Sequence, residues 1–183
     1  MTAGKPGEEL IIRDESHIIA HENGSPGRIA RLLTKTISNP FGYITPEELK
    51  KHIRKKKDHQ APKNGILCLE YPTFEGIIPP ISEFHECGKI AKEAGMHVHV
   101  DAARIFTGLA ESKVDPKEIM KYADTMAICL SKGLLAPLGS VVLGKSKEVM
   151  TRFKANRKMM GGVLRKPGVV AGAALISLKK MRL

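Results

Sequence analysis

The chain has 183 residues, 42% of them hydrophobic, and its Lys and Arg residues outnumber Asp and Glu by 30 to 19. This length corresponds to one domain, which can bury a core without disulfides or metal ions, so intrinsic disorder is not expected. No apolar run approaches the roughly 20 residues that span a bilayer, and residues 1–9 are polar. The sequence therefore predicts neither a transmembrane nor a secreted protein, and we expect a cytoplasmic location.

The cysteines Cys68, Cys87 and Cys129 lie in apolar surroundings and lack the C-x-x-C spacing of a zinc site or a redox pair. We interpret all three as small core side chains. An odd number of thiols also fits a reducing compartment. No metal site is expected.

The net charge of +11 raises the question of a nucleic acid, a membrane surface or an anionic ligand as partner. Much of this charge lies in residues 50–57, and Thr45, Pro46 and Glu48 before them have the pattern of a helix start. The basic run is therefore predicted to form the last turns of that helix, where cations complement the helix dipole. A solvated helix end is the simpler interpretation. Binding of RNA or anionic lipid is the other interpretation, although the run lacks the interleaved aromatic residues expected of a protein that binds single-stranded nucleic acid.

Residues 66–101 alternate between strand and helix patterns. Residues 66–69 are a continuous apolar run, typical of a strand buried on both faces. Residues 81–94 carry apolar side chains at helical spacing, with Gly95 as a stop signal. Residues 96–101 follow as a short strand. Together these segments predict a βαβ unit with parallel strands.

The alternation continues in the second half of the chain. Residues 115–124 begin with the Asp and Pro of a helix start, and residues 126–130 and 141–143 have the pattern of strands. Residues 146–159 predict a long basic helix that a glycine pair ends. This order favours an α/β fold with a mostly parallel sheet flanked by helices.

Ionisable side chains follow two of the predicted strands. Asp101 closes one strand, and Ser131 and Lys132 follow another. Ligands of open parallel sheets bind at the carboxyl ends of the strands. Two interpretations are open: Asp101 and Lys132 form a plain salt bridge, or Lys132 is a Schiff-base nucleophile and Asp101 partners a protonated pyridine nitrogen, as pyridoxal phosphate chemistry requires.

Three strings, HVDAAR at residues 99–104, CLSKGLLAPLGS at 129–140 and RKMMGGVLR at 157–165, resemble in order three signatures of the threonine aldolases. The second string is the most specific, and the resemblance covers residues 8–178, nearly the whole chain. Threonine aldolases are pyridoxal-phosphate enzymes of fold-type I, related to the aminotransferases. The resemblance thus implies the large domain of that fold and pyridoxal 5'-phosphate (PLP) as the cofactor.

The resemblance also implies roles for single residues. Lys132 would bond the cofactor covalently, and Asp101 would hold its pyridine nitrogen protonated. Arg104 corresponds to an arginine near the ring oxygen of the cofactor and the substrate carboxylate, and His17 to a histidine that stacks on the cofactor ring. Arg165 is expected near the same site. A lone His or Arg in such a place is more often a surface or structural group, and only the ordered set favours these roles.

The implied reaction is retro-aldol cleavage of a β-hydroxy-α-amino acid, L-threonine or L-allo-threonine, to glycine and an aldehyde. The aldehyde from threonine is acetaldehyde. His99 shares a strand face with Asp101, so it either donates a hydrogen bond at the site or is purely structural. The alternative function is a non-catalytic chain that binds a partner through its basic surface.

Three positions depart from the family pattern. Ala102 stands in place of the usual glycine, Thr73 in place of an active-site histidine, and Val163 in place of a third glycine after the basic helix. The resemblance further implies that residues 1–183 are a partial large domain, without the N-terminal segment that holds the cofactor phosphate and without the C-terminal small domain. Family members are dimers or tetramers with shared active sites, so we expect a homo-oligomer and exposed apolar surface.

Overall fold

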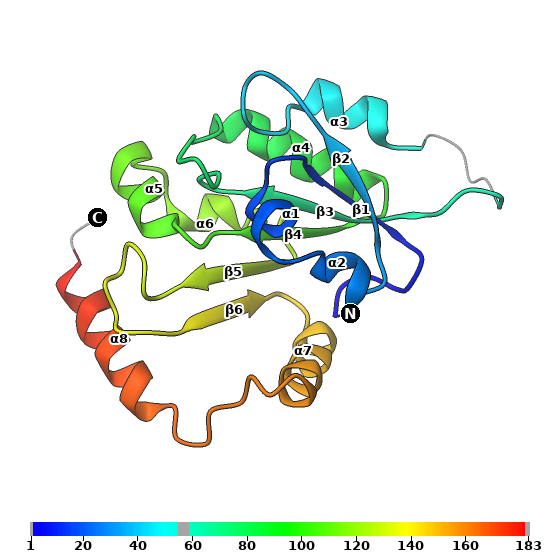
Figure 1. The fold of residues 1–183 in the computed structure, drawn as a ribbon. Coiled ribbons are helices and arrows are strands. Elements are labelled where there is room, and N and C mark those ends of the chain that lie inside the picture. Colours follow the sequence, from blue (N-terminus) through cyan, green and yellow to red (C-terminus); the bar gives the residue numbers. More distant parts are fainter. Residues whose placement is uncertain (1, 55–58, 182–183) are drawn as a thin grey trace.

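A computed structural model of the chain describes residues 2–54 and 59–181, which form a six-stranded sheet flanked by helices (Figure 1). The strand order is β2-β1-β3-β4-β5-β6. Neighbouring strands are parallel except β6, which runs antiparallel to β5 at one edge. The prediction of a mostly parallel sheet is therefore confirmed. The strands are β1 (Glu9–Arg13), β2 (Leu33–Ile37), β3 (Asn64–Glu70), β4 (His97–Asp101), β5 (Thr125–Cys129) and β6 (Ser140–Gly144).

The predicted βαβ unit lies at the centre of this sheet. β3 pairs in parallel with β4, with Ile66 opposite His97 and Glu70 opposite Asp101. The helix α4 (Ile81–Glu93) connects the two strands. β3 is buried along its whole length, as expected of an apolar run that is covered on both faces.

Helices cover both faces of the sheet, because alternate residues of each strand point to opposite sides. One face forms the main core, where Leu67 and Val98 are fully buried. The opposite face forms a smaller cluster around Leu10 and Cys68, which packs against α1 and the segment after α2. The helices of the main core are α3 (Pro46–His52), α4, α5 (Ile105–Ser112) and α6 (Pro116–Ile119). The smaller cluster contains residues of α1 (His17–His21) and Ala30, which follows α2 (Ser25–Arg28).

The C-terminal helices α7 (Lys147–Met159) and α8 (Gly168–Lys180) lie on the β6 side of the sheet (Figure 1). α7 has almost the predicted bounds and contains no fully buried residue. α8 buries Ala174 against Leu134 and Ala136 from the loop after β5. Within the described residues, no helix is long and apolar enough to cross a bilayer.

Two helix predictions are wrong in their ends. α6 ends at Ile119 rather than near Asp124, because Asp124 hydrogen bonds twice to Val98: its N–H donates to the Val98 carbonyl, and its Oδ2 accepts from the Val98 N–H, both at 2.8 Å. α3 ends at His52, since the N–H of Arg54 donates to Asn64 Oδ1 at 2.9 Å and draws the chain toward β3. Residues 55–57 of the basic run lie outside the described residues.

Candidate active site

The carboxyl ends of the parallel strands bring several of the predicted site residues to one edge of the sheet. His17 begins α1 shortly after β1, Asp101 is the last residue of β4, and Lys132 follows the end of β5. β1, β3, β4 and β5 are consecutive in the sheet. Their carboxyl ends therefore form a single rim, where ligands of such sheets bind.

Asp101 and Lys132 do not form an ion pair with each other or with any other described residue, so the salt-bridge interpretation is not supported. Both residues are half-buried. Asp101 Oδ1 accepts a hydrogen bond of 3.0 Å from the N–H of Ala103. This turn orients the carboxylate at the strand end, and among the described residues no hydrogen bond or ion pair engages Oδ2.

The loop that carries Lys132 packs closely against the start of α5. A Cβ atom added to Gly133 would lie 2.7 Å from Thr107 Oγ1 and 3.3 Å from Phe106 Cβ, so only glycine fits without a shift. Because α5 begins four residues after Asp101, this close approach ties the Lys132 loop to the end of β4. The packing holds the loop that carries Lys132 beside the helix that follows Asp101.

Cys129 is not a core side chain, and that prediction is wrong. It is partly exposed because the second half of β5 is only partly covered, and its Sγ lies 3.3 Å from Ser131 Oγ. Burial alone would raise the pKa of this thiol, but the hydrogen bonds from Ser131 and the positive charge of Lys132 lower it. Cys68 and Cys87 are buried as expected, and burial raises the pKa of Cys87 to about 12.

His17 and Arg104 lie against the same aromatic ring. The imidazole of His17 meets Phe74 nearly edge to face, with ring centroids 5.4 Å apart. The guanidinium carbon of Arg104 lies 5.0 Å from the centroid of the Phe74 ring, a cation–π distance. Two predicted site residues from different elements, α1 and the start of α5, are thus joined through a residue that the sequence analysis did not select.

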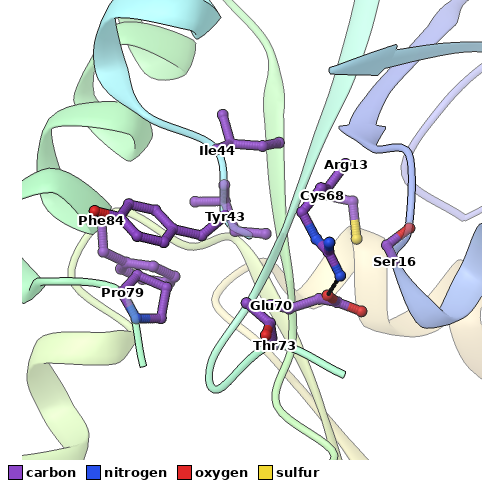
Figure 2. Close-up of a pocket in the computed structure, with 10 residues that line it drawn as sticks. Arg13, Ser16, Tyr43, Ile44, Cys68, Glu70, Thr73, Pro79 and Phe84 are labelled. Atoms are coloured by element: carbon purple, nitrogen blue, oxygen red, sulfur yellow. Dashed lines mark ion pairs between the residues drawn. The ribbon is translucent and has the colours of Figure 1, made fainter. Parts of the chain in front are cut away.

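Glu70, at the end of β3, is a second site residue that the sequence analysis missed. Its buried carboxylate accepts the backbone N–H of His17 at 2.9 Å and that of Phe74 at 3.3 Å. Figure 2 shows the side chain of Arg13 reaching this carboxylate, with Nη2 at 3.8 Å from Oε2. Burial raises the pKa of Glu70, and the charge of Asp101 adds to that rise, although the two N–H donors and Arg13 oppose it. An acidic residue that ends an otherwise apolar strand was the available signal.

The chain is similar to known proteins along nearly its whole length. The model of a protein family described as "Beta-eliminating lyase" matches residues 1–183. The chain belongs to the beta-eliminating lyase family. It is 36% identical to the "Probable low-specificity L-threonine aldolase 2" of Arabidopsis thaliana over 176 residues, which are 94% of this chain and 49% of that protein. It is 35% identical to the "Low-specificity L-threonine aldolase 1" of the same plant, over 95% of this chain and 49% of that protein.

A solved structure of threonine aldolase from Leishmania major superposes with a TM-score of 0.86. The match covers 98% of this chain and 52% of that one at 18% identity, and so shows the fold alone. The fold class, a mostly parallel α/β sheet like that of fold-type I enzymes, is confirmed, as is the resemblance to threonine aldolases, whereas the assignment to a partial large domain stays a prediction. The chain spans about half the length of the curated relatives it matches.

The three positions that were expected to depart from the threonine aldolase pattern have different surroundings. Ala102 is fully buried, so its methyl group packs in the main core. Thr73 is 1% exposed, and its Oγ1 accepts from the N–H of Ile77 at 3.2 Å, so the hydroxyl belongs to the turn after β3 and does not substitute for a histidine. Figure 2 shows Thr73 beside Glu70 at this turn. Val163 is exposed in the linker between α7 and α8.

Arg165 lies in the same exposed linker, drawn in orange below the sheet in Figure 1. Among the contacts of the described residues, none joins Arg165 to His17, Asp101, Arg104 or Lys132. His17, Asp101, Arg104 and Lys132 follow the ends of β1, β4 and β5, whereas Arg165 belongs to the linker after α7, and its role in the site stays a prediction.

His99 has a hydrogen bond within the sheet, which supports the structural interpretation. Its Nδ1 lies 2.9 Å from Thr125 Oγ1, and Nε2 of His97 lies 2.8 Å from the same oxygen. Burial lowers the pKa of His99 to about 4, although the charge of Asp101 acts in the opposite direction. The ring is therefore neutral at pH 7.

The groups on the rim fit the cofactor that the family resemblance implies. A pyridine ring needs a carboxylate beside its nitrogen, an amine for covalent attachment and a flat side chain against its face. Asp101 has a carboxylate oxygen available, Lys132 has no ion-pair partner in the described part of the chain, and His17 presents an imidazole held by Phe74. The close packing of Gly133 fixes the attachment loop at that place.

Proposed function

We propose that this chain takes part in PLP-dependent retro-aldol cleavage of L-threonine or L-allo-threonine to glycine and acetaldehyde, in the cytoplasm. Residues 1–183 would form part of the cofactor-binding large domain. The observation that carries the proposal is the rim where Lys132, which has no ion pair among the described residues, follows the end of β5, and where its loop packs through Gly133 on the helix after the half-buried Asp101. The names of the relatives support the same reaction and the same class of substrate.

When bound, PLP supplies an electron sink for the electron pair left by the broken Cα–Cβ bond. The Nζ atom of Lys132 attaches the cofactor. The carboxylate of Asp101 holds a proton at the pyridine nitrogen. Arg104 binds the carboxylate of the amino-acid substrate through its guanidinium group, and His17 packs its imidazole against the cofactor ring. Glu70 keeps the start of α1, and with it His17, at the rim through the 2.9 Å bond to the backbone.

The proposal is tested by mixing the chain with PLP, reducing with borohydride and mapping the modified lysine by mass spectrometry. We expect one modified residue, Lys132, and no such product in Lys132→Ala. The matched control is Lys89→Ala, which removes an exposed lysine of α4 and should leave the labelling of Lys132 unchanged. Labelling that is spread over many lysines and unchanged in Lys132→Ala would contradict the proposal.

The role of Asp101 is tested by the release of glycine from threonine. Asp101→Asn should lower the rate about 100-fold or more, the range for a lost group that holds a catalytic proton. Its thermal midpoint should stay near that of the wild type, because Asp101 is only half-buried and its Oδ1 bond to Ala103 can be kept by Asn. Near-normal turnover in this variant would contradict the proposed role.

We also propose that the chain is a homo-oligomer. Large apolar side chains are exposed on the C-terminal region, with Val169 84%, Ile176 57% and Leu175 56% exposed on α8. A second copy that covers this surface would remove it from water. Sedimentation velocity should show a dimer or a larger species, and replacing Leu175 and Ile176 by Lys should shift it toward the monomer. A wild-type chain that is a monodisperse monomer would contradict this proposal.

A further inference from the structure

The ring of Phe74 is the common contact of three side chains at the rim. His17 lies 5.4 Å from it, His21 lies 4.6 Å from it, and the guanidinium carbon of Arg104 lies 5.0 Å from it, all measured to ring centroids. His17 and His21 come from α1, whereas Arg104 precedes α5. The ring therefore sets the position of side chains from two separate elements relative to each other.

The backbone of Phe74 is fixed by the same group that fixes His17. Each oxygen of the buried Glu70 carboxylate accepts one backbone N–H, Oε1 from His17 and Oε2 from Phe74. One side chain thus holds both partners of the His17–Phe74 ring contact. Arg13 provides the positive charge that this buried carboxylate needs.

Thr73, the residue before Phe74, has its side chain inside the turn. The hydroxyl of Thr73 accepts from the N–H of Ile77 inside the turn, and Thr73 is 1% exposed. Phe74 is half-buried, and its ring contacts His17 and Arg104 rather than the inside of the turn. Of these two consecutive residues, Phe74 is the one that the turn presents to the rim.

We propose that Phe74 is a positioning residue of the cofactor site, which orients the imidazole of His17 and the guanidinium of Arg104 through its ring and is itself held by Glu70. This inference rests on the proposed function, because it gives His17 and Arg104 their roles toward PLP and the substrate. A cation–π contact and an edge-to-face contact are both lost when the aromatic ring is replaced by an aliphatic side chain of similar size.

The first test uses the chain without cofactor. Phe74→Leu should move the imidazole NMR resonances of His17 and His21, because the ring current of Phe74 acts on both. Phe41→Leu is the matched control, since Phe41 is 60% exposed and its ring contacts Tyr43 instead. Resonances of His17 and His21 that are the same in Phe74→Leu and in the wild type would overturn the inference.

The second test measures PLP binding by absorbance and by the circular dichroism induced in the bound cofactor. Phe74→Leu should weaken the Kd about fivefold and change the induced dichroism, at a thermal midpoint like that of Phe41→Leu. Phe74→Tyr should retain the Kd and the induced dichroism of the wild type, because it keeps the aromatic face. A Phe74→Leu variant with the Kd and dichroism of the wild type would overturn this inference alone. A wild-type chain that fails to bind PLP at Lys132 would overturn the proposed function and this inference together.

Discussion

Two regions of the molecule differ in how much of their apolar surface is buried. In the first region, from β1 to β5, the strands contribute fully buried side chains such as Ile11, Leu67 and Val100 to a core that α3, α4 and α5 cover. In the second region, from β6 to α8, α7 contains no fully buried residue and α8 buries Ala174 alone. The first region has a core of its own, whereas the second region is attached to it through few buried contacts.

This difference in burial indicates which contacts are lost only in global unfolding and which can be lost locally. We expect a buried side chain of the first region to lose its contacts when the whole sheet unfolds, and α7, which buries no residue, to open while the sheet stays intact. The four predictions below compare the two regions, or the rim with the core beneath it.

The largest effect is expected for a truncation in the central strand. Leu67→Ala should lower the free energy of unfolding by about 3 kcal/mol, because it leaves a cavity in β3 between two covered faces. Leu175→Ala, on the exposed face of α8, should change it by less than about 0.5 kcal/mol. Urea unfolding followed by circular dichroism measures both. Equal losses in the two variants would mean that α8 is as firmly packed as the sheet.

The second prediction compares a thiol on the rim with a thiol in the core. Cys129 should react with iodoacetamide at least about tenfold faster than Cys87 at pH 8, because its pKa is lowered while burial raises that of Cys87 to about 12. The rate at Cys129 should also rise less steeply toward pH 9 than that of a free cysteine. Mass spectrometry of the modified peptides gives both rates. Similar rates at Cys129 and Cys87 would show that the rim is closed to solvent.

The elements that the sequence predicted are those whose buried apolar side chains repeat at a regular spacing. The pattern of residues 66–101 predicted β3, α4 and β4, because their apolar side chains repeat with the period of a strand or of a helix. The sequence analysis assigned no element to α1 or α2, which are short and are stabilised by packing on the sheet rather than by their own pattern.

A site residue was predictable only where it lies at the end of a strand with a clear apolar pattern or matches the threonine aldolase family. Asp101 and Lys132 were found in this way, and His17 and Arg104 through the family resemblance. Glu70 and Phe74 were not found, since their importance depends on three-dimensional contacts with His17 that no spacing in the sequence reveals. Cys129 was placed in the core because the alternation along β5 carries no information about where the covering helices end.

The third prediction concerns the buried charge below the rim. The raised pKa of Glu70 means that its ionisation costs stability in the folded state. The stability of the wild type relative to Glu70→Gln should therefore be greatest below about pH 4.3, the pKa of an unfolded glutamate, and should be lost as the pH rises through the folded pKa. Urea unfolding of both proteins across this range measures the difference.

Glu75 provides the control with the opposite sign. Burial alone would raise its pKa, but the hydrogen bond and charge of Arg13 lower it. The stability of the wild type relative to Glu75→Gln should thus be present above about pH 4.3 and be lost as the pH falls through the lowered pKa. If the stability difference from the wild type changed with pH in the same direction for Glu70→Gln and Glu75→Gln, the opposite pKa shifts of the two carboxylates beside Arg13 would be wrong.

The smallest effect is expected at the helix N-caps. Ser146 Oγ accepts the N–H of Val149 at the start of α7, and Thr45 Oγ1 accepts the N–H of Glu48 at the start of α3. Replacing either residue by Ala should cost about 1 kcal/mol. In Thr45→Ala the lost N-cap bond should reduce the free energy of global unfolding, since α3 is packed through Leu49. In Ser146→Ala the lost bond should only speed hydrogen exchange within α7, which buries no residue. A Ser146→Ala variant that lowers global stability would mean that α7 unfolds with the sheet.

The hydroxyl group of Thr125 restricts the tautomers of two histidines. Its oxygen lies within hydrogen-bond distance of His97 Nε2 and of His99 Nδ1, yet a hydroxyl has one hydrogen to donate. At most one of these two nitrogens can therefore accept, and the other must carry the proton itself. The proton position on one strand residue is thus linked to that of its neighbour two residues away, a correlation that the nitrogen chemical shifts of the two rings would record directly.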